Sequence, residues 1–307
     1  MARRVTSFLL LLILASACSG QEPIVQNSGT TENLRGLSVP SPTIVWASGT
    51  HGTYLRTIDA GKTWAAAQVP GADGLDFRDV QAFDGDIAYL LAAGPGEQSR
   101  IYKTTDAGQH WTLQFNNHDP AGFLDCMAFW DRDHGIVLGD PVNGKFMLLV
   151  TTDGGKHWQH LTSSPSAIEG EGSFAASGTC IATAKKKDVW FGTGGAAARV
   201  FHSSERGRTW SVVDSPLPRS NATSGIFSIA FRDRTHGVIA GGDYKHPRDD
   251  GPNLAFTTDG GITWTLSDIK PQAYFSAVAY DRKVNEAATQ QTAEQSAAKS
   301  KVKIVRA

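Results

Sequence analysis

Six polar side chains have the chemistry to bind or cleave a polar ligand, and they fall in segments rich in Gly, Ser and Pro. They are Asp140, Glu169, Glu171, Arg199, Asp243 and Tyr244. Carboxylates, a guanidinium group and a phenol can orient a polar ligand, and paired carboxyl groups can act as acid and base in glycoside hydrolysis. The same residue types are common in solvated loops and turns. These side chains could therefore line a ligand pocket or could be ordinary loop residues. The choice depends on the strands and loops that position them.

The cysteines and histidines predict no cofactor site. The sequence contains no C-x-x-C and no close His/Cys cluster, so no metal is expected. No G-x-G-x-x-G segment follows a strand and opens a helix, so no nucleotide cofactor is expected either. Cys126 and Cys180 could form a disulfide in an exported protein. The interpretation we favour is two buried small apolar side chains in neighbouring strands.

One pattern, [ST]-x-D-x-G-x-x-W, recurs five times and indicates how the chain is built. The copies end at tryptophans 64, 111, 158, 210 and 264. We expect each acidic side chain to accept backbone hydrogen bonds across a turn, with Gly supplying a positive φ and Trp packing beneath. These structural residues are Asp59, Trp64, Asp106, Trp111, Asp153, Trp158, Glu205, Trp210, Asp259 and Trp264. Because the fourth copy has Glu205 and Arg206 in place of Asp and a small residue, its turn should be looser.

Short apolar runs surround every copy of the pattern. In the second repeat they cover 77–83, 87–91 and 101–103, and the residues after Trp111 supply a fourth run. Four short antiparallel strands in a unit of about 50 residues are typical of a propeller blade. The sequence therefore predicts an all-β propeller of four-stranded blades over residues 34–280, with five complete repeats and the start of a sixth at 275–280.

The same arrangement predicts where the polar candidates lie. The repeated turns join the third and fourth strands and occupy one face, whereas the loops between the second and third strands and between blades occupy the other. The six polar side chains all belong to long loops of this second face, at 139–144, 163–177, 194–199 and 241–253. By analogy, most propellers bind ligands at the axis on that face.

The repeated turns resemble the BNR or Asp-box repeats of sialidase-type propellers. Together with F-x-D-x-x-F-like inner strands and D-x-x-H-G before the second strand, the pattern looks like the photosystem II stability and assembly factor family. The resemblance covers about residues 34–280 and implies seven blades, a non-enzymatic binding or assembly role, and a protein or glycan partner. It specifies the fold more strongly than the function.

A sialidase-like, carbohydrate-active hydrolase is the alternative that the same resemblance raises. Such an enzyme needs three arginines on a carboxylate, a Tyr nucleophile paired with Glu, and an acidic residue. Only Arg199 and Arg248 lie in the loops of the candidate face, although Tyr244 and Glu171 could form the nucleophile pair. No catalytic residue is therefore assigned, and a binding module is the preferred reading.

The first 18 residues are typical of an export signal. Arg3 and Arg4 precede an apolar run at 8–14 that is too short to span a bilayer permanently. Ala15-Ser16-Ala17 fits ordinary signal cleavage, but with Cys18 it also resembles a lipobox, which predicts lipidation of Cys18. Residues 19–33 are polar and suit a flexible tether. We expect an exported protein, anchored to the membrane on its periplasmic or outer side.

Net charge and the C-terminal tail complete the predictions. A formal net charge of −1 argues against a nucleic-acid partner. Residues 281–307 lack Trp, Gly and the repeated turn, and their Ala, Gln, Glu and Lys content favours a helix or disorder. A chain that supplies fewer than seven blades is either truncated or closes unusually, and 302–305 could pair as a strand beside the first blade.

Overall fold

The computed structural model describes residues 25–219, 221–268, 273–280 and 302–305. In this part of the chain nearly all regular structure is β-strand, with one short 3-10 turn, η1 (Gly96–Gln98). The strands form a series of antiparallel sheets in which successive strands are neighbours. The predicted all-β fold of four-stranded blades is confirmed.

Five sheets are complete blades, numbered here in chain order. Blade 1 contains β1 (Leu34–Ser38), β2 (Val45–Gly49), β3 (Thr53–Thr57) and β4 (Ala65–Gln68), and blade 2 contains β5 (Phe77–Ala82), β6 (Ala88–Ala92), β7 (Arg100–Thr104) and β8 (Thr112–Asn116). Blade 3 contains β9 (Leu124–Phe129), β10 (Gly135–Val142), β11 (Lys145–Thr151) and β12 (Gln159–His160). Blade 4 contains β14 (Ile181–Ala184), β15 (Asp188–Gly192), β17 (Arg199–Ser203) and β18 (Ser211–Asp214), and blade 5 contains β19 (Ser224–Phe231), β20 (Gly237–Asp243), β21 (Leu254–Thr257) and β22 (Thr265–Leu266).

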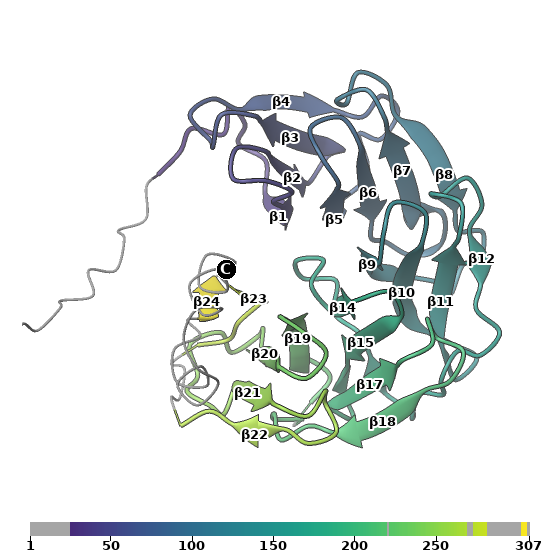
Figure 1. The fold of residues 1–307 in the computed structure, drawn as a ribbon, viewed down its shortest axis with the longest axis vertical. Coiled ribbons are helices and arrows are strands. Elements are labelled where there is room, and N and C mark those ends of the chain that lie inside the picture. The colour runs from purple at the N-terminus through teal and green to yellow at the C-terminus, as the bar shows by residue number, and fades with distance from the viewer. Residues whose placement is uncertain (1–24, 220, 269–272, 281–301, 306–307) are drawn as a thin grey trace, which may run out of the picture.

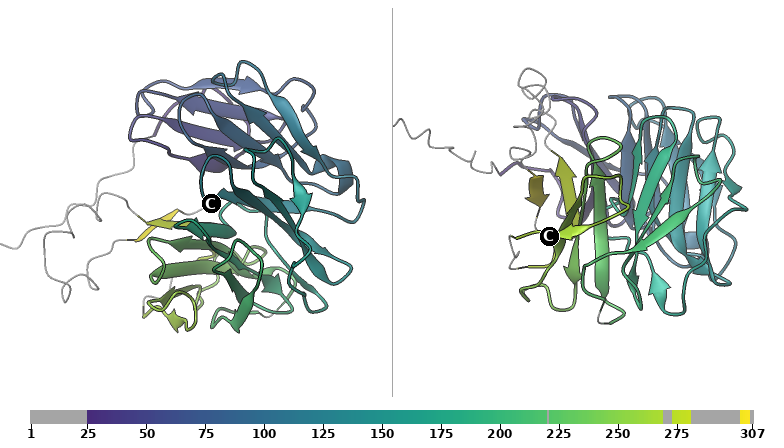
Figure 2. Two further views of the ribbon diagram at one scale, coloured as in Figure 1. Left: turned by 45° about the vertical axis from the view of Figure 1, so that its right-hand side comes forward. Right: turned by 60° about the horizontal axis from the view of Figure 1, so that its bottom comes forward.

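The blades are arranged around a common centre, as Figure 1 shows in a view down the ring. Strands β1, β5, β9, β14 and β19 lie nearest the centre, and Figure 2 shows the blades side by side from two other directions. Two further short strands, β13 (Glu171–Gly172) and β16 (Gly194–Gly195), extend the sheet of blade 5 from its inner edge, because β16 pairs with β19 at Gly225. These two strands belong to loops of the face opposite the repeated turns.

A sixth, two-stranded sheet lies between blade 5 and blade 1 (Figure 1). It pairs β23 (Ala277–Tyr280) antiparallel with β24 (Val302–Val305). The prediction of helix or disorder over 281–307 is wrong for these four residues, whose β-branched content suits a strand. Their partner is β23 rather than the first blade, and the rest of 281–307 lies outside the described residues.

Apolar side chains fill the spaces between adjacent blades. Trp46 and Tyr54 of blade 1 pack with Leu90 and Tyr102 of blade 2 and with the half-buried Trp111. The other blade junctions have equivalent clusters. Burial of these rings supplies much of the stability of the ring, since each large side chain contributes roughly 1.5–3 kcal/mol when it leaves water.

The repeated turns have the hydrogen bonds that the sequence implies. In the first, the Asp59 carboxylate accepts a bond of 2.9 Å from the Thr63 N–H, and Thr57 Oγ1 accepts a bond of 3.0 Å from the Gly61 N–H. In the fourth, Ser203 Oγ still accepts from the Gly207 N–H, but the Glu205 carboxylate binds the Thr209 hydroxyl and Arg208. The longer Glu205 side chain therefore bonds to side chains, where Asp59 in the first turn bonds to a backbone N–H.

The turns also join neighbouring blades. Tyr54 of blade 1 donates a hydrogen bond of 2.7 Å to the Gly108 carbonyl in the turn of blade 2, and Tyr89 of blade 2 donates one of 2.7 Å to Gly154 in blade 3. Trp190 of blade 4 donates one of 2.8 Å to Gly260 in blade 5. The repeated turns are therefore structural fasteners on one face of the ring.

Cys126 and Cys180 form a disulfide, with their Cα atoms 6.0 Å apart. Cys126 lies in β9, and Cys180 immediately precedes β14, so the bond joins the inner strands of blades 3 and 4. The preference for two reduced, buried cysteines is therefore corrected. Equivalent positions on adjacent inner strands place the two side chains within bonding range.

The N-terminal segment also differs from the prediction of a flexible tether over 19–33. Residues 25–33 form no strand or helix, yet Gln26 Oε1 accepts a hydrogen bond of 2.9 Å from Trp64 Nε1, and Glu32 binds Thr50 and His51. The second half of that segment therefore lies against blade 1. Cys18 and the signal lie outside the described residues. Over the residues that are described, no helix has both the length and the apolar character needed to cross a membrane.

Candidate functional site

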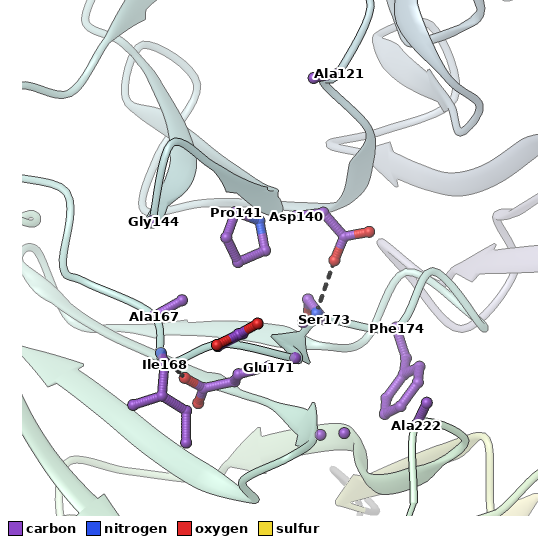
Figure 3. Close-up of a pocket in the computed structure, with 15 residues that line it drawn as sticks. Ala121, Asp140, Pro141, Gly144, Ala167, Ile168, Glu171, Ser173, Phe174 and Ala222 are labelled. Atoms are coloured by element: carbon purple, nitrogen blue, oxygen red, sulfur yellow. Dashed lines mark hydrogen bonds between the residues drawn. The ribbon is translucent and has the colours of Figure 1, made fainter.

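A pocket of about 800 Å³ lies on the face opposite the repeated turns (Figure 3). Loops of blades 3 and 4 and the connections between blades 2, 3, 4 and 5 supply its walls. The lining residues include Asp140 and Pro141 at the end of β10, residues 167–174, and Gly194 and Gly195 of β16. Three of the six polar candidates, Asp140, Glu169 and Glu171, therefore line one cavity.

Glu171 and Arg199 form a buried ion pair beside the pocket. The Glu171 carboxylate accepts a hydrogen bond of 2.8 Å from Arg199 Nε and a second from Arg199 Nη2. It also accepts bonds from the Thr193 hydroxyl at 2.6 Å and the Ile168 N–H at 3.1 Å. The bond with Glu171 raises the pKa of Arg199 above its usual value. With its side chain fully buried and every acceptor site occupied, Glu171 holds the loop in place and is not available to a ligand.

Asp140 is the carboxyl group that faces the cavity. Its Oδ1 accepts a hydrogen bond of 2.9 Å from the Ser173 N–H, as the dashed line in Figure 3 shows. Burial raises the pKa of Asp140, and the bond from Ser173 opposes that shift. Gly172 allows this approach, because a Cβ there would lie 2.9 Å from Asp140 Oδ1. Glu169 lines the same cavity and is exposed to solvent.

The centre of the ring is crossed by the chain itself. Segment 173–179 is bonded to blade 3 through Asp140, to blade 2 through Arg78, which donates a bond of 3.0 Å to the Ala175 carbonyl, and to blade 5 through Thr179 and Ser228. Ser177 donates a bond of 2.7 Å to the Ser276 carbonyl next to β23. The site expected at the axis is therefore displaced outward, over the junction of blades 3, 4 and 5.

Two buried aspartates on the inner strands lie against this segment and were not among the predicted site residues. Asp79 in β5 accepts a hydrogen bond of 2.7 Å from the Met127 N–H, and burial raises its pKa to about 8. Burial also raises the pKa of Asp125 in β9 well above its usual value, and the negative charge of Asp140 adds to the shift. The F-x-D pattern at 77–79 was visible in the sequence, but its burial depends on segment 173–179, which no local pattern predicts.

The remaining two candidates, Asp243 and Tyr244, lie beside the pocket rather than in it. Although burial acts to raise the pKa of Asp243, bonds from Thr223, Asn221 and His246 hold it well below its usual range. Asp243 therefore organises its own turn. Tyr244 is 47% exposed and packs edge-on against Phe174, a lining residue, with ring centroids 6.3 Å apart.

The parts of a sialidase site are not brought together in the described residues. Among the described residues, Glu171 is paired with Arg199 and makes no hydrogen bond with Tyr244, and no arginine lines the cavity. In the same part of the chain, no group of three or more His, Cys, Asp or Glu side chains is placed to hold a metal ion. The cavity presents two carboxyl groups, backbone amides of a glycine-rich loop, and the apolar side chains of Pro141, Ile168 and Phe174.

Four-stranded blades with Asp-box turns define the fold as a BNR-repeat β-propeller. The family model described as BNR/Asp-box repeat matches residues 255–266, the fifth of the repeated turns. No curated protein matches the sequence significantly.

Solved structures agree with that fold. An ancestral GH74 enzyme has a TM-score of 0.54 at 13% identity, over 84% of this chain and 37% of its own, so this chain spans little more than a third of that enzyme. Structures titled "YCF48 bound to D1 peptide" (TM-score 0.44, 18% identity, covering 81% of this chain and 87% of that one) and "YCF48 from Cyanidioschyzon merolae" (0.41, 17%, 81% and 90%) are also similar. At 13% identity the likeness to the GH74 enzyme supports the fold alone, and the function must be argued from the site.

Proposed function

We propose that this chain is an exported, lipid-anchored propeller that acts as a non-enzymatic binding or assembly module through the pocket on its loop face. The observation that carries the proposal is that the two faces of the ring are built differently. The Asp-box turns are internally bonded fasteners, whereas the opposite face has a cavity of about 800 Å³ with an exposed acid and exposed apolar side chains. A partner protein at the membrane surface is the ligand we infer.

In this proposal, anchoring the propeller to the membrane favours binding of a partner that is held at the same membrane. A lipid on Cys18 would hold the propeller close to the membrane, and residues 25–33 lie against blade 1. A membrane-held partner would then bind at high effective concentration, which favours a modest pocket over a large interface.

The binding test blocks the pocket without disturbing the fold. Ala222 is exposed and lines the cavity, so Ala222→Trp should fill space that the partner needs. Ala66→Trp is the matched control, because Ala66 is also exposed but lies on outer strand β4. In a pull-down from solubilised membranes, we expect the full chain and Ala66→Trp to retain the same protein and Ala222→Trp to lose it. Equal recovery by all three would contradict binding through this pocket.

A carbohydrate-active hydrolase is the second candidate, and one observation favours it. Asp140 and Glu169 line the same cavity, and burial raises the pKa of Asp140, as a general acid requires. The sialidase form of this idea has no support, because Glu171 and Tyr244 are engaged elsewhere. Release of reducing sugar from a panel of glucans, lost in Asp140→Asn, would identify a hydrolase.

A further inference from the structure

The polar side chains of the pocket are acidic. Asp140, Glu169 and Glu171 line it, and among the residues that the structure describes no Lys, Arg or His side chain does. Arg199 neutralises Glu171 from outside the cavity. Within the described residues no ion pair joins Asp140 or Glu169 to a cation. The cavity therefore carries two carboxyl groups whose charge the protein does not compensate.

Buried oxygens without hydrogen-bond partners lie in and beside the cavity. Ser173 is a lining residue, is 7% exposed, and its Oγ has no partner in the structure. Asp125 is 1% exposed, and its Oδ2 likewise has none. Buried polar atoms are rarely left unpaired, so an unpaired oxygen in a cavity wall indicates that a ligand supplies the missing donor. Of these two residues only Ser173 lines the cavity, and its Oγ can accept a hydrogen bond from an N–H group of a ligand.

The opposite wall is apolar. Ala167 and Ile168 form it, and Figure 3 shows them across the cavity from the Asp140 carboxyl group, while the apolar Pro141 lies next to Asp140. Ile168 is 48% exposed, so it offers apolar surface to a ligand in the cavity. A ligand that matches both walls must combine a hydrocarbon stem with a cationic head. Lysine and arginine side chains have this shape.

We propose that the pocket binds a lysine or arginine side chain of a partner protein, with the cationic head at Asp140 and Glu169 and the stem on Ile168 and Pro141. The proposal rests on the binding function proposed above and names the chemistry that the partner must present. A glycan would use the same acids as hydrogen-bond acceptors but would not need a positive charge, so the two ligands can be separated by charge alone.

Binding of a cation should depend on pH in a defined direction. Burial raises the pKa of Asp140. The titratable and charged groups around it are the buried Asp125 of β9, which also interacts with Arg78, and Glu169 and the Glu171–Arg199 pair at the same cavity. A bound cation favours the ionised form of Asp140 and so lowers that pKa. Binding therefore releases a proton when Asp140 starts protonated, and affinity should fall as the pH is lowered.

The test follows the glycine amides of the pocket in the full chain by two-dimensional NMR. Gly170, Gly172, Gly194 and Gly195 line the cavity and report on its contents. The probes are the peptide acetyl-Gly-Gly-Arg-Gly-Gly-amide and the same peptide with neutral citrulline in place of arginine. The variants are Asp140→Asn and Glu169→Gln, and the control is Asp73→Asn, which removes the same charge from an exposed aspartate of another loop.

We expect saturable shifts of these amides with the arginine peptide and binding at least tenfold weaker with citrulline. Asp140→Asn and Glu169→Gln should each weaken binding several-fold, whereas Asp73→Asn should not, and only Asp140→Asn should remove the pH dependence. Glu169 is exposed, so its substitution tests the proposal even if Asp140→Asn folds poorly. Equal shifts with both peptides, or none, would overturn the cationic ligand. If the Ala222→Trp pull-down still shows pocket-dependent binding, the proposed function survives and only the ligand chemistry fails.

Discussion

The carboxyl groups of this chain titrate in opposite directions according to their place in a blade. In the first repeated turn, hydrogen bonds from Thr63 and Thr57 lower the pKa of Asp59 to about 2. On the inner strand of blade 2, burial raises the pKa of Asp79 to about 8. The turns therefore use charged acceptors at the surface, while the centre of the ring holds neutral carboxylic acids.

This difference predicts how stability depends on pH. The folded pKa of Asp79 lies above its unfolded value, so the folded chain binds more protons between about pH 4 and pH 8. The free energy of unfolding should consequently fall as the pH rises through this window, and the raised pKa values of Asp125 and Asp140 act in the same sense. Asparagine cannot ionise, so Asp79→Asn should lose less Tm between pH 5 and pH 8 than the parent chain. Asp73→Asn is the control, and parallel Tm profiles for Asp79→Asn and the parent would refute the buried-acid account.

At the scale of elements, segment 173–179 determines where the pocket can lie. It crosses the centre of the ring and meets Asp79 at Gly178, where a Cβ would lie 2.2 Å from the Asp79 carboxylate oxygen. Gly178 also has a φ of +73°, a conformation that costs other residues about 1–2 kcal/mol. Both constraints explain why this position must be glycine.

A pair of substitutions separates the two constraints. Gly71 has nearly the same φ, +75°, but open space around its Cβ position. Gly71→Ala should therefore lower the free energy of unfolding only by the cost of a positive φ at an alanine. Gly178→Ala should lower it by about 1–3 kcal/mol more, because its Cβ would overpack against Asp79. Urea unfolding of the two variants measures the difference. An equal loss of unfolding free energy in the two variants would mean that segment 173–179 is loosely packed at the centre of the ring.

The elements also show how far sequence alone could reach. Five repeated turns with apolar runs around them predicted the blades, because each turn is a local structure with its own hydrogen bonds. Strand β1 was not recognised as a separate run, since its sequence Leu-Arg-Gly-Leu-Ser lacks alternation. The two-residue strands β13 and β16 exist only because distant loops pair, and β24 depends on β23. Such elements are set by tertiary context rather than by local propensity.

The candidate site was predicted in the same uneven way. The predicted topology put Asp140, Glu169 and Glu171 on one face, and in the structure these three residues line one pocket. It could not show that Glu171 is neutralised by Arg199 or that Asp243 serves its own turn, because both facts depend on side-chain geometry. The apolar wall at Ile168 was also missed, since one isoleucine in a polar loop carries no pattern.

At the scale of the whole molecule, the proposed lipid on Cys18 would determine where the propeller works. Cys18→Ser should move the mature protein from the membrane fraction to the soluble periplasmic or external fraction, because a thioether-linked lipid cannot form on serine. Ser19→Ala, which keeps the cysteine, should fractionate like the parent chain. Fractionation after cell lysis and immunoblotting measures both. Persistence of the Cys18→Ser protein in membranes would contradict the anchor.

The central claim is that the loop face, and not the Asp-box face, meets a partner protein. Two exposed isoleucines allow a direct comparison: Ile168 in the pocket, 48% exposed, and Ile262 in the fifth repeated turn, 69% exposed. A photo-crosslinking amino acid at each position, activated in intact cells, reports which face is occupied. We predict a discrete crosslinked species from position 168, lost when Ala222→Trp is added, and none from position 262. A partner captured from position 262 but not from 168 would contradict the account.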